Sequence, residues 1–116
     1  MDGEEALERN VVFHIDELHR WRTLLSNVRN LVESAGVGNI KVLANGEAVS
    51  GLCLGADTHE MVEQLLRHGV RFLACRNSLL AQRRTSDDLL DGVSVVPVGV
   101  LHLAERQWDR WAYVRP

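Results

Sequence analysis

The stretch RFLACRNSLL, residues 71–80, holds the side chains best suited to chemistry. Its cysteine, Cys75, ends an apolar run. Three polar residues follow it directly: Arg76, Asn77 and Ser78. If a short helix begins behind Cys75, its free N–H groups would stabilise a thiolate, and the side chains that follow could add hydrogen bonds and a positive charge. This pattern predicts a nucleophile or a carrier of persulfide sulfur at Cys75.

A purely structural role for Cys75 stays open, because cysteine is among the residue types that proteins bury most often. The other cysteine, Cys53, lies within the apolar run GLCLG and is expected to be structural. We expect no stapling disulfide between the two, because the chain is expected to work in a reducing compartment. The sequence has no C-x-x-C motif and no Cys/His cluster with zinc spacing. No metal and no cofactor is therefore predicted.

Short apolar runs rich in β-branched and aromatic residues predict strands, and apolar residues at steps of three and four predict helices. The expected strands cover residues 11–16, 40–44, 70–75, 93–98 and 112–114. A long helix is expected from residue 18 to the glycines at 36 and 38, and a second from a capping box of Asp57 and Glu60 to Gly69. Short helices are expected near Asn77 and Ser86. A last helix is expected to bury one apolar face, which comprises Val100, Leu101, Ala104, Trp108 and Trp111.

Strands that alternate with helices predict right-handed crossovers and a mainly parallel sheet covered on both faces. We therefore expect one domain over residues 1–116, a three-layer α/β/α sandwich with about five strands. Residues 1–10, MDGEEALERN, are expected to form a flexible tail.

The carboxyl ends of the predicted strands are the expected place for a site, because open α/β sheets bind ligands there. Besides the group that begins at Cys75, the residues at these ends are His14, Asp16, Glu17, Asn45 and Gly99. Among all of them, only Cys75 is a good nucleophile. The five histidines lack metal-ligand spacing, and no glycine-rich phosphate loop is present.

Composition argues against several classes of protein. With 13 Lys and Arg against 16 Asp and Glu, the formal net charge is −3, unlike that of a general nucleic-acid binder. No run approaches the roughly 20 apolar residues of a transmembrane helix. The acidic N-terminal stretch is unlike a secretory signal peptide. We therefore expect a cytoplasmic protein that binds neither a membrane nor nucleic acid directly.

Several stretches together resemble the DsrE-like family of small sulfur-relay proteins. They are VVFHIDE, NVRNL, VLANGEAV, GVRFLACRNSL and VSVVPVGVLHLAERQ, and they extend over nearly the whole chain. The chain is similar in particular to the stand-alone, single-domain members. The resemblance implies a parallel five-stranded α/β/α fold that assembles into trimers or hexamers.

The resemblance also implies roles for individual residues. Cys75 corresponds to the cysteine that accepts sulfur as a persulfide, and Asn77 and Ser78 match the polar pair behind it. Asn45 matches a polar position at the neighbouring strand end. Two residues depart from the family pattern: Arg76 stands where a small residue is common, and Ser78 replaces a frequent threonine. Arg76 could therefore alter access to the thiol or the choice of partner.

Two functions follow as expectations. The first is a sulfur carrier, a possible sulfurtransferase, that takes sulfane sulfur from a donor protein onto Cys75 and passes it to an acceptor thiol. Its pocket would be shaped by Asn45, Arg76, Asn77 and Ser78. The second is a non-catalytic oligomeric module that binds a small ligand or a protein at the strand ends. A thiol redox enzyme fits less well, since no resolving cysteine lies near Cys75 in the sequence.

An oligomer is expected on separate grounds. The sequence has three tryptophans, and two of them, Trp108 and Trp111, lie close together near the end of the chain. A domain of this size has a thin core that does not easily bury so much aromatic surface. Protein interfaces are enriched in such side chains, so a subunit interface would cover part of it.

Overall fold

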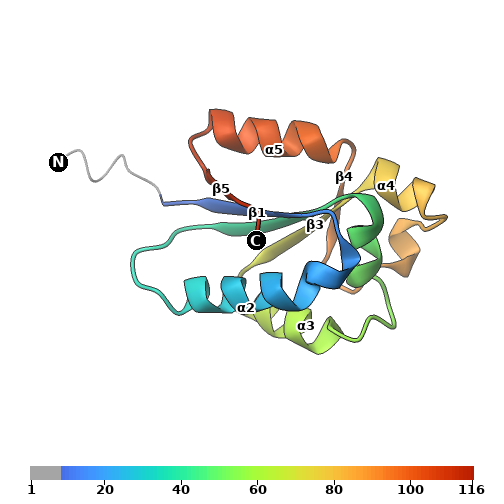
Figure 1. Cartoon of the computed structure of the whole chain (residues 1–116), viewed down its shortest axis with the longest axis horizontal. Coiled ribbons are helices and arrows are strands. Elements are labelled where there is room, and N and C mark those ends of the chain that lie inside the picture. Colours follow the sequence, from blue (N-terminus) through green and yellow to red (C-terminus); the bar gives the residue numbers. More distant parts are fainter. Residues whose placement is uncertain (1–8) are drawn as a thin grey trace.

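Every apolar run predicted as a strand forms one in the computed structural model, which describes residues 9–116 (Figure 1). The bounds agree with the predicted ones to within two residues at each end. The strands are β1 (Val11–Ile15), β2 (Ile40–Ala44), β3 (Arg71–Cys75), β4 (Ser94–Val96) and β5 (Ala112–Val114).

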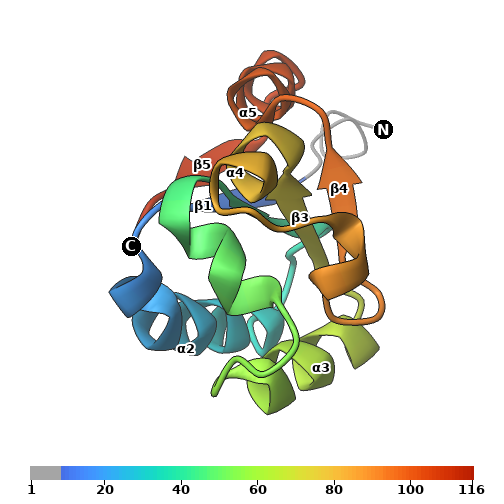
Figure 2. The same ribbon diagram turned by 90° about the vertical axis from the view of Figure 1, so that its right-hand side faces the viewer.

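The five strands form one parallel sheet in the order β4-β3-β2-β1-β5. The register aligns the carboxyl ends of the three central strands, because Ile15 pairs with Ala44 and Ala44 with Ala74. At the next position Cys75 pairs with Val96 of β4. The residues that follow β1, β2 and β3 therefore gather at one edge, the carboxyl edge of the sheet, which Figure 2 faces.

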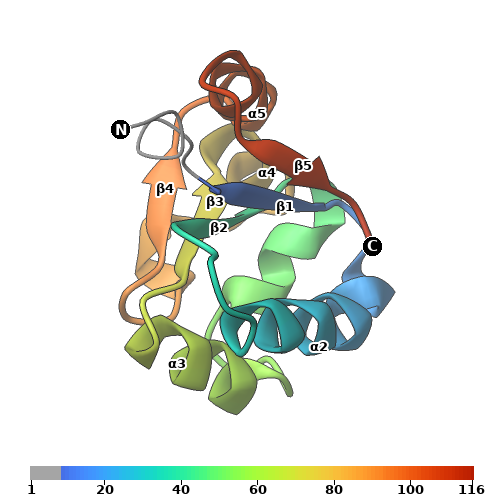
Figure 3. The same cartoon turned by 90° about the vertical axis from the view of Figure 1, so that its left-hand side faces the viewer.

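Helices cover both faces of this sheet, which confirms the predicted three-layer α/β/α sandwich. One face is covered by α2 (Trp21–Val32) and α3 (His59–Arg67), and the other by α5 (Gly99–Trp108), as Figures 1 and 3 show. The short helix α4 (Arg76–Ala81) begins directly after β3 at the carboxyl edge. Three 3-10 helices complete the fold: η1 (Leu18–Arg20), η2 (Gly46–Leu52) and η3 (Ser86–Asp88).

The core has two unequal halves, one on each face of the sheet. The larger half lies under α2 and α3 and includes Leu25, Val42 and Phe72. The smaller half lies beneath α5 and consists of Val12, Leu43, Leu73 and Leu103, with Val96 and Trp111 packed against it. The apolar layer between α5 and the sheet is therefore smaller than the one under α2 and α3. Polar and charged side chains lie at both ends of this face of the sheet.

The prediction for the last helix was wrong about which face is buried. In α5 the buried residues are Gly99 and Leu103, whereas Val100, Leu101 and Trp108 are 67%, 47% and 72% exposed. Leu103 lies one helical turn from the exposed Val100, so both belong to one broad apolar face, and the spacing did not single out the part of it that meets the sheet.

The predicted capping box of Asp57 and Glu60 is wrong. The helix after Asp57 begins at His59, its N-cap Thr58 makes no side-chain cap, and Asp57 instead forms an ion pair with Arg22 at 3.2 Å. The predicted tail, residues 1–10, lies outside the described residues up to residue 8, but Asn10 is buried and its side-chain oxygen accepts from the Asn39 N–H at 2.8 Å. Asn10 is thus part of the packed domain.

None of the helices within residues 9–116 combines the length and the hydropathy that a membrane span requires.

Candidate functional site

Cys75 lies where the strand-end argument predicted a site. It is the last residue of β3 and the residue from which α4 starts, and its side chain is 6% exposed. The backbone N–H of Gly99, the first residue of α5, donates a hydrogen bond to the Cys75 Sγ at 3.4 Å. The sulfur is therefore enclosed between the start of α4 and the start of α5.

The lack of a side chain at Gly99 allows α5 to approach the thiol closely. A Cβ at this position would lie 3.1 Å from the Cys75 Cβ, 3.2 Å from the Leu43 Cδ1 and 3.4 Å from the Cys75 Sγ. The first two distances are shorter than ordinary carbon–carbon contacts, so a side chain here would require the surrounding atoms to shift. The small residue after β4 thus allows a backbone donor to reach the cysteine.

The surroundings of Cys75 lower the pKa of its thiol below the ordinary value. Burial is the largest single effect and raises the pKa, but the Ser78 hydroxyl and the backbone N–H groups of Ser78, Gly99 and Asn77 together outweigh it. Among residues 9–116, only the Gly99 N–H has the geometry of a hydrogen bond to the neutral sulfur. The other groups lie around Sγ, and their interaction with it becomes stronger when the thiol loses its proton.

Ser78 connects the thiol to the neighbouring strand end. Its Oγ accepts a hydrogen bond from the Gly46 N–H at 2.8 Å, so its own proton is available to the sulfur of Cys75. Gly46 begins η2 directly after Asn45, and η2 and α4 lie side by side at the carboxyl edge (Figure 2). The hydroxyl is thus held by η2, and its proton is free to turn toward the sulfur at the end of β3.

The other predicted pocket residues lie near this edge but do not all face the sulfur. Asn77 is exposed and contributes its backbone N–H rather than its side chain. Arg76 is exposed too, and its charge has no part in lowering the pKa of Cys75. Instead, Arg76 and Arg84 line a groove of about 270 Å³ between α4 and β4, together with Leu79, Leu80, Thr85, Ser86 and Val95.

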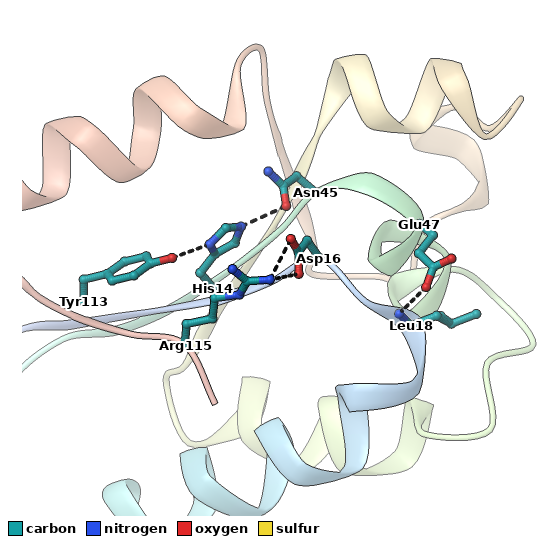
Figure 4. Close-up of polar contacts among 7 residues, drawn as sticks. All are labelled: His14, Asp16, Leu18, Asn45, Glu47, Tyr113 and Arg115. Atoms are coloured by element: carbon teal, nitrogen blue, oxygen red, sulfur yellow. Dashed lines mark hydrogen bonds and ion pairs between the residues drawn. The ribbon is translucent and has the colours of Figure 1, made fainter.

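Asn45 belongs to a second polar cluster at the same edge (Figure 4). Its Oδ1 lies 2.9 Å from the His14 Nε2, and the His14 Nδ1 lies 2.6 Å from the Tyr113 hydroxyl. Beside them, Arg115 forms an ion pair with Asp16 at 2.8 Å. A neutral His14 satisfies both contacts when Nε2–H donates to Asn45 and Nδ1 accepts from Tyr113.

Tyr113 and Arg115 were not predicted, although His14, Asp16 and Asn45 were identified as strand-end residues. Tyr113 lies 99 positions after its partner His14, and Arg115 lies 99 positions after Asp16. They reach the end of β1 only because β5 pairs with β1. Burial, the largest effect, raises the pKa of Tyr113, which keeps the phenol protonated as a donor.

Cys53 differs sharply from Cys75. It is 1% exposed, and its thiol donates to the Val49 carbonyl at 3.5 Å. Burial raises the pKa of the Cys53 thiol, and the nearby Asp88 raises it further, while Arg84 acts in the opposite direction without reversing the shift. Both cysteines are free thiols.

Within the part of the chain that the structure describes, no three His, Cys, Asp or Glu side chains are grouped as metal ligands would be. The carboxyl edge brings together the Cys75 thiol, its hydrogen-bond donors and the adjacent His14–Asn45–Tyr113 cluster.

Comparisons with known proteins give structural relatives. No protein-family model matches the chain, and no curated protein does either. The solved structure of MTH1491 from Methanobacterium thermoautotrophicum, described as a protein of unknown function, is 44% identical and superposes with a TM-score of 0.88. The match covers 94% of this chain and 100% of MTH1491.

Two more distant structures share the fold. BT1422 from Bacteroides thetaiotaomicron, a conserved protein of unknown function, is 14% identical with a TM-score of 0.75, and the match covers 92% of this chain and 94% of BT1422. The ychN protein from E. coli is 15% identical with a TM-score of 0.69 over 95% of this chain and 100% of the other. At such identities the likeness concerns the fold alone. The identity and full coverage of the first match go further, and the chain belongs to the same family as MTH1491.

Proposed function

We propose that this protein is a sulfur carrier that holds sulfane sulfur as a persulfide on Cys75. The observation that carries the proposal is the position of the Cys75 sulfur between the starts of α4 and α5, where the Gly99 N–H donates to it; these surroundings lower the pKa of the thiol despite burial of the side chain. A thiolate at the carboxyl edge of a parallel sheet is a suitable nucleophile in the place where such folds bind ligands.

The proposed reaction is two successive displacements at sulfur. The Cys75 thiolate attacks the outer sulfur of a donor persulfide; the S–S bond of the donor breaks, and the donor leaves as a thiolate. Cys75 then carries the outer sulfur as a persulfide. In the second step an acceptor thiolate attacks that sulfur, and Cys75 leaves as a thiolate, so no oxidant or reductant is consumed.

The neighbouring residues would have distinct parts in this reaction. The Ser78 hydroxyl and the Gly99 N–H would stabilise the negative sulfur before attack and again when Cys75 leaves. Arg76 would act on the approach to the site, because it is exposed on the groove beside α4. Asn45 would hold the adjacent His14 in place, and Asn77 would contribute its backbone N–H.

The resemblance to the DsrE-like family supports the proposal, and the similar ychN protein has a DsrE-like fold. On this basis we also propose donor and acceptor proteins as partners, a cytoplasmic location, and a homo-oligomer, trimer or hexamer. The exposed Val100, Leu101 and Trp108 on α5 supply apolar surface that subunit contacts could bury. Sedimentation at micromolar concentration checks the assembly, and a monomer at all concentrations would contradict it.

The test of the sulfur carrier is loading with a low-molecular-weight persulfide, followed by intact-protein and peptide mass spectrometry. We expect the mass of one added sulfur atom on the Cys75 peptide. The adduct should be lost in Cys75→Ser and retained in Cys53→Ala. An adduct on Cys53 alone, or none on Cys75 under conditions that load a free thiol peptide, would refute the proposal.

The second candidate is a non-catalytic oligomeric module that binds a ligand or protein at the strand ends. It is favoured by the 6% exposure of Cys75 and by the close contact of Gly99 with the sulfur, which narrow the approach of a donor. In that case Cys75→Ser would leave partner binding unchanged, and Cys75 would react with iodoacetamide no faster than a model thiol.

A further inference from the structure

The edge of the sheet opposite Cys75 carries a cationic groove. It lies at the amino ends of β2 and β3, beneath the end of α5, on the side of the molecule that Figure 3 faces. Its volume is about 220 Å³, and it is lined by Asn39, Ile40, Lys41, Gly69, Arg71 and Trp111. Neither the sequence patterns nor the proposed sulfur chemistry accounts for it.

Positive charges gather around Trp111. The Lys41 Nζ lies 5.1 Å from the centre of a Trp111 ring, and the Arg106 Cζ lies 5.6 Å from a ring of the same side chain. Arg71 lines the groove beside them and is close enough to act on the charge of Lys41. These contacts hold the cations in place, because an aromatic face attracts them.

Among residues 9–116, the cluster has too few carboxylates to neutralise it. Asp109 pairs with Arg106 at 3.2 Å, and neither Lys41 nor Arg71 has a carboxylate partner within ion-pair distance in this part of the chain. The three cations and one anion of these residues give a local charge of 3 − 1 = +2, in a chain whose formal net charge is −3.

The positive charges of this cluster repel one another, and burial together with this repulsion lowers the pKa values of nearby groups. Burial, Arg106 and Arg71 lower the pKa of Lys41, against the opposing effect of Asp109. Burial, Lys41 and Arg106 lower the pKa of His102 to about 4, so this imidazole is neutral. The His102 Nε2 and the Arg106 Nε are buried and find no hydrogen-bond partner among residues 9–116. A bound anion would relieve the repulsion between these groups.

We propose that this groove is a binding site for a dianionic oxyanion, a phosphate or sulfate group. Such a group matches the local charge of +2. The planar Arg71 guanidinium can donate two parallel hydrogen bonds to it, and Lys41, which pairs with Arg71 in the sheet register, adds a second positive charge beside it. Trp111 provides an apolar surface for whatever organic group carries the oxyanion.

The test is titration of the full-length chain with inorganic phosphate, sulfate and acetate at low ionic strength, followed by amide and indole NMR shifts. We expect saturable binding of both dianions and weaker binding of acetate. The shifts should centre on Asn39, Lys41, Gly69, Arg71 and the Trp111 indole, and Cys75→Ser should bind equally well. Phenyl phosphate distinguishes the source of the group: tighter binding than inorganic phosphate indicates an organic phosphate, and equal binding indicates the free ion.

Matched charge deletions decide the matter. Arg71→Gln and Lys41→Gln should each weaken phosphate binding about tenfold, since a hydrogen bond to a charged group is lost. Arg71 is exposed, so its variant should fold even if Lys41→Gln does not. Arg22→Gln removes the same charge from an ion pair on the other face of the sheet and should bind like the wild type. No saturable binding, or equal weakening by Arg22→Gln and Arg71→Gln, would overturn the proposal.

Discussion

Cys53 and Cys75 are both buried free thiols in one small fold, yet the protein shifts their pKa values in opposite directions. Cys53 sits at the end of η2, where its thiol donates to a backbone carbonyl, and burial and Asp88 raise its pKa more than Arg84 lowers it. Cys75 sits between two helix starts, where the Gly99 N–H donates to the sulfur and further N–H groups and a hydroxyl lower its pKa. Burial alone therefore does not make a thiol inert; the balance of acceptors and donors around it does.

The largest expected difference between the two thiols is their rate of alkylation. At neutral pH Cys75 should react with iodoacetamide clearly faster than Cys53, because its lowered pKa leaves more thiolate, whereas the raised pKa of Cys53 keeps that thiol protonated. Mass spectrometry of the labelled peptides measures both rates in one sample. The two rates should converge in denaturant, and similar rates in the folded protein would break the comparison.

Gly99→Ala should disturb the surroundings of Cys75 and leave those of Cys53 unchanged, so the two thiols should become more alike. The new Cβ would be crowded by Cys75 and Leu43, and relief of such crowding costs about 1–3 kcal/mol of unfolding free energy. Displacement of α5 should also take the Gly99 N–H away from the sulfur and slow the alkylation of Cys75.

The matched control for Gly99→Ala is Val100→Ala at the next, exposed position of the same helix. Denaturant unfolding and alkylation kinetics of the two variants should differ clearly. If Gly99→Ala matched the wild type in both, the close approach of α5 would not matter to the thiol.

Ser78→Ala should raise the pKa of Cys75 without affecting Cys53. The variant loses the hydroxyl that acts on the sulfur and leaves the Gly46 N–H without its acceptor. We expect alkylation of Cys75 to slow about threefold to tenfold at neutral pH, because a hydrogen bond to a charged group is lost. Ser78→Thr keeps the hydroxyl and should restore the rate; failure of this rescue would assign the loss to packing.

The smallest expected effects are opposite slopes of stability against pH. The pKa of Cys75 is lower in the folded than in the unfolded protein. Its thiolate therefore contributes to the free energy of unfolding above the unfolded pKa, and this contribution is lost as pH falls through the folded pKa. The pKa of Cys53 is higher in the folded than in the unfolded protein. Its contribution to the free energy of unfolding is therefore present below the unfolded pKa and is lost as pH rises through the folded pKa. Urea unfolding between about pH 7 and about pH 10 should show the two slopes as differences from Cys75→Ser and Cys53→Ala. Slopes of the same sign would contradict the assigned pKa directions.

Much of this fold could be predicted from the sequence, since short apolar runs and glycine punctuation act locally. β2 was predicted with its observed bounds, and the position of Cys75 at a strand end followed from the same pattern. The buried face of α5 could not be read, because exposed Val100 and Leu101 are as apolar as buried Leu103. Which face of α5 meets the sheet depends on the contact of Gly99 with Cys75, and these two residues belong to segments that are distant in the sequence.

The composition of the candidate site was predicted less well than its location. Side-chain type and position identified Ser78, whose hydroxyl acts on the sulfur. They could not show that Asn45 is engaged by His14, nor that Arg76 faces a separate groove. Those outcomes depend on side-chain directions, and on β5, which brings Tyr113 against His14.

The lengths of the strands have a consequence for aggregation. The inner strands β1, β2 and β3 have five residues each, whereas the edge strands β4 and β5 have three. Pro97 follows β4 directly, and Arg115 and Pro116 follow β5. Short edges that end in proline or a charge offer few backbone groups to a strand from another molecule. The sheet can thus keep an apolar, fully parallel centre without presenting a long template for intermolecular β pairing.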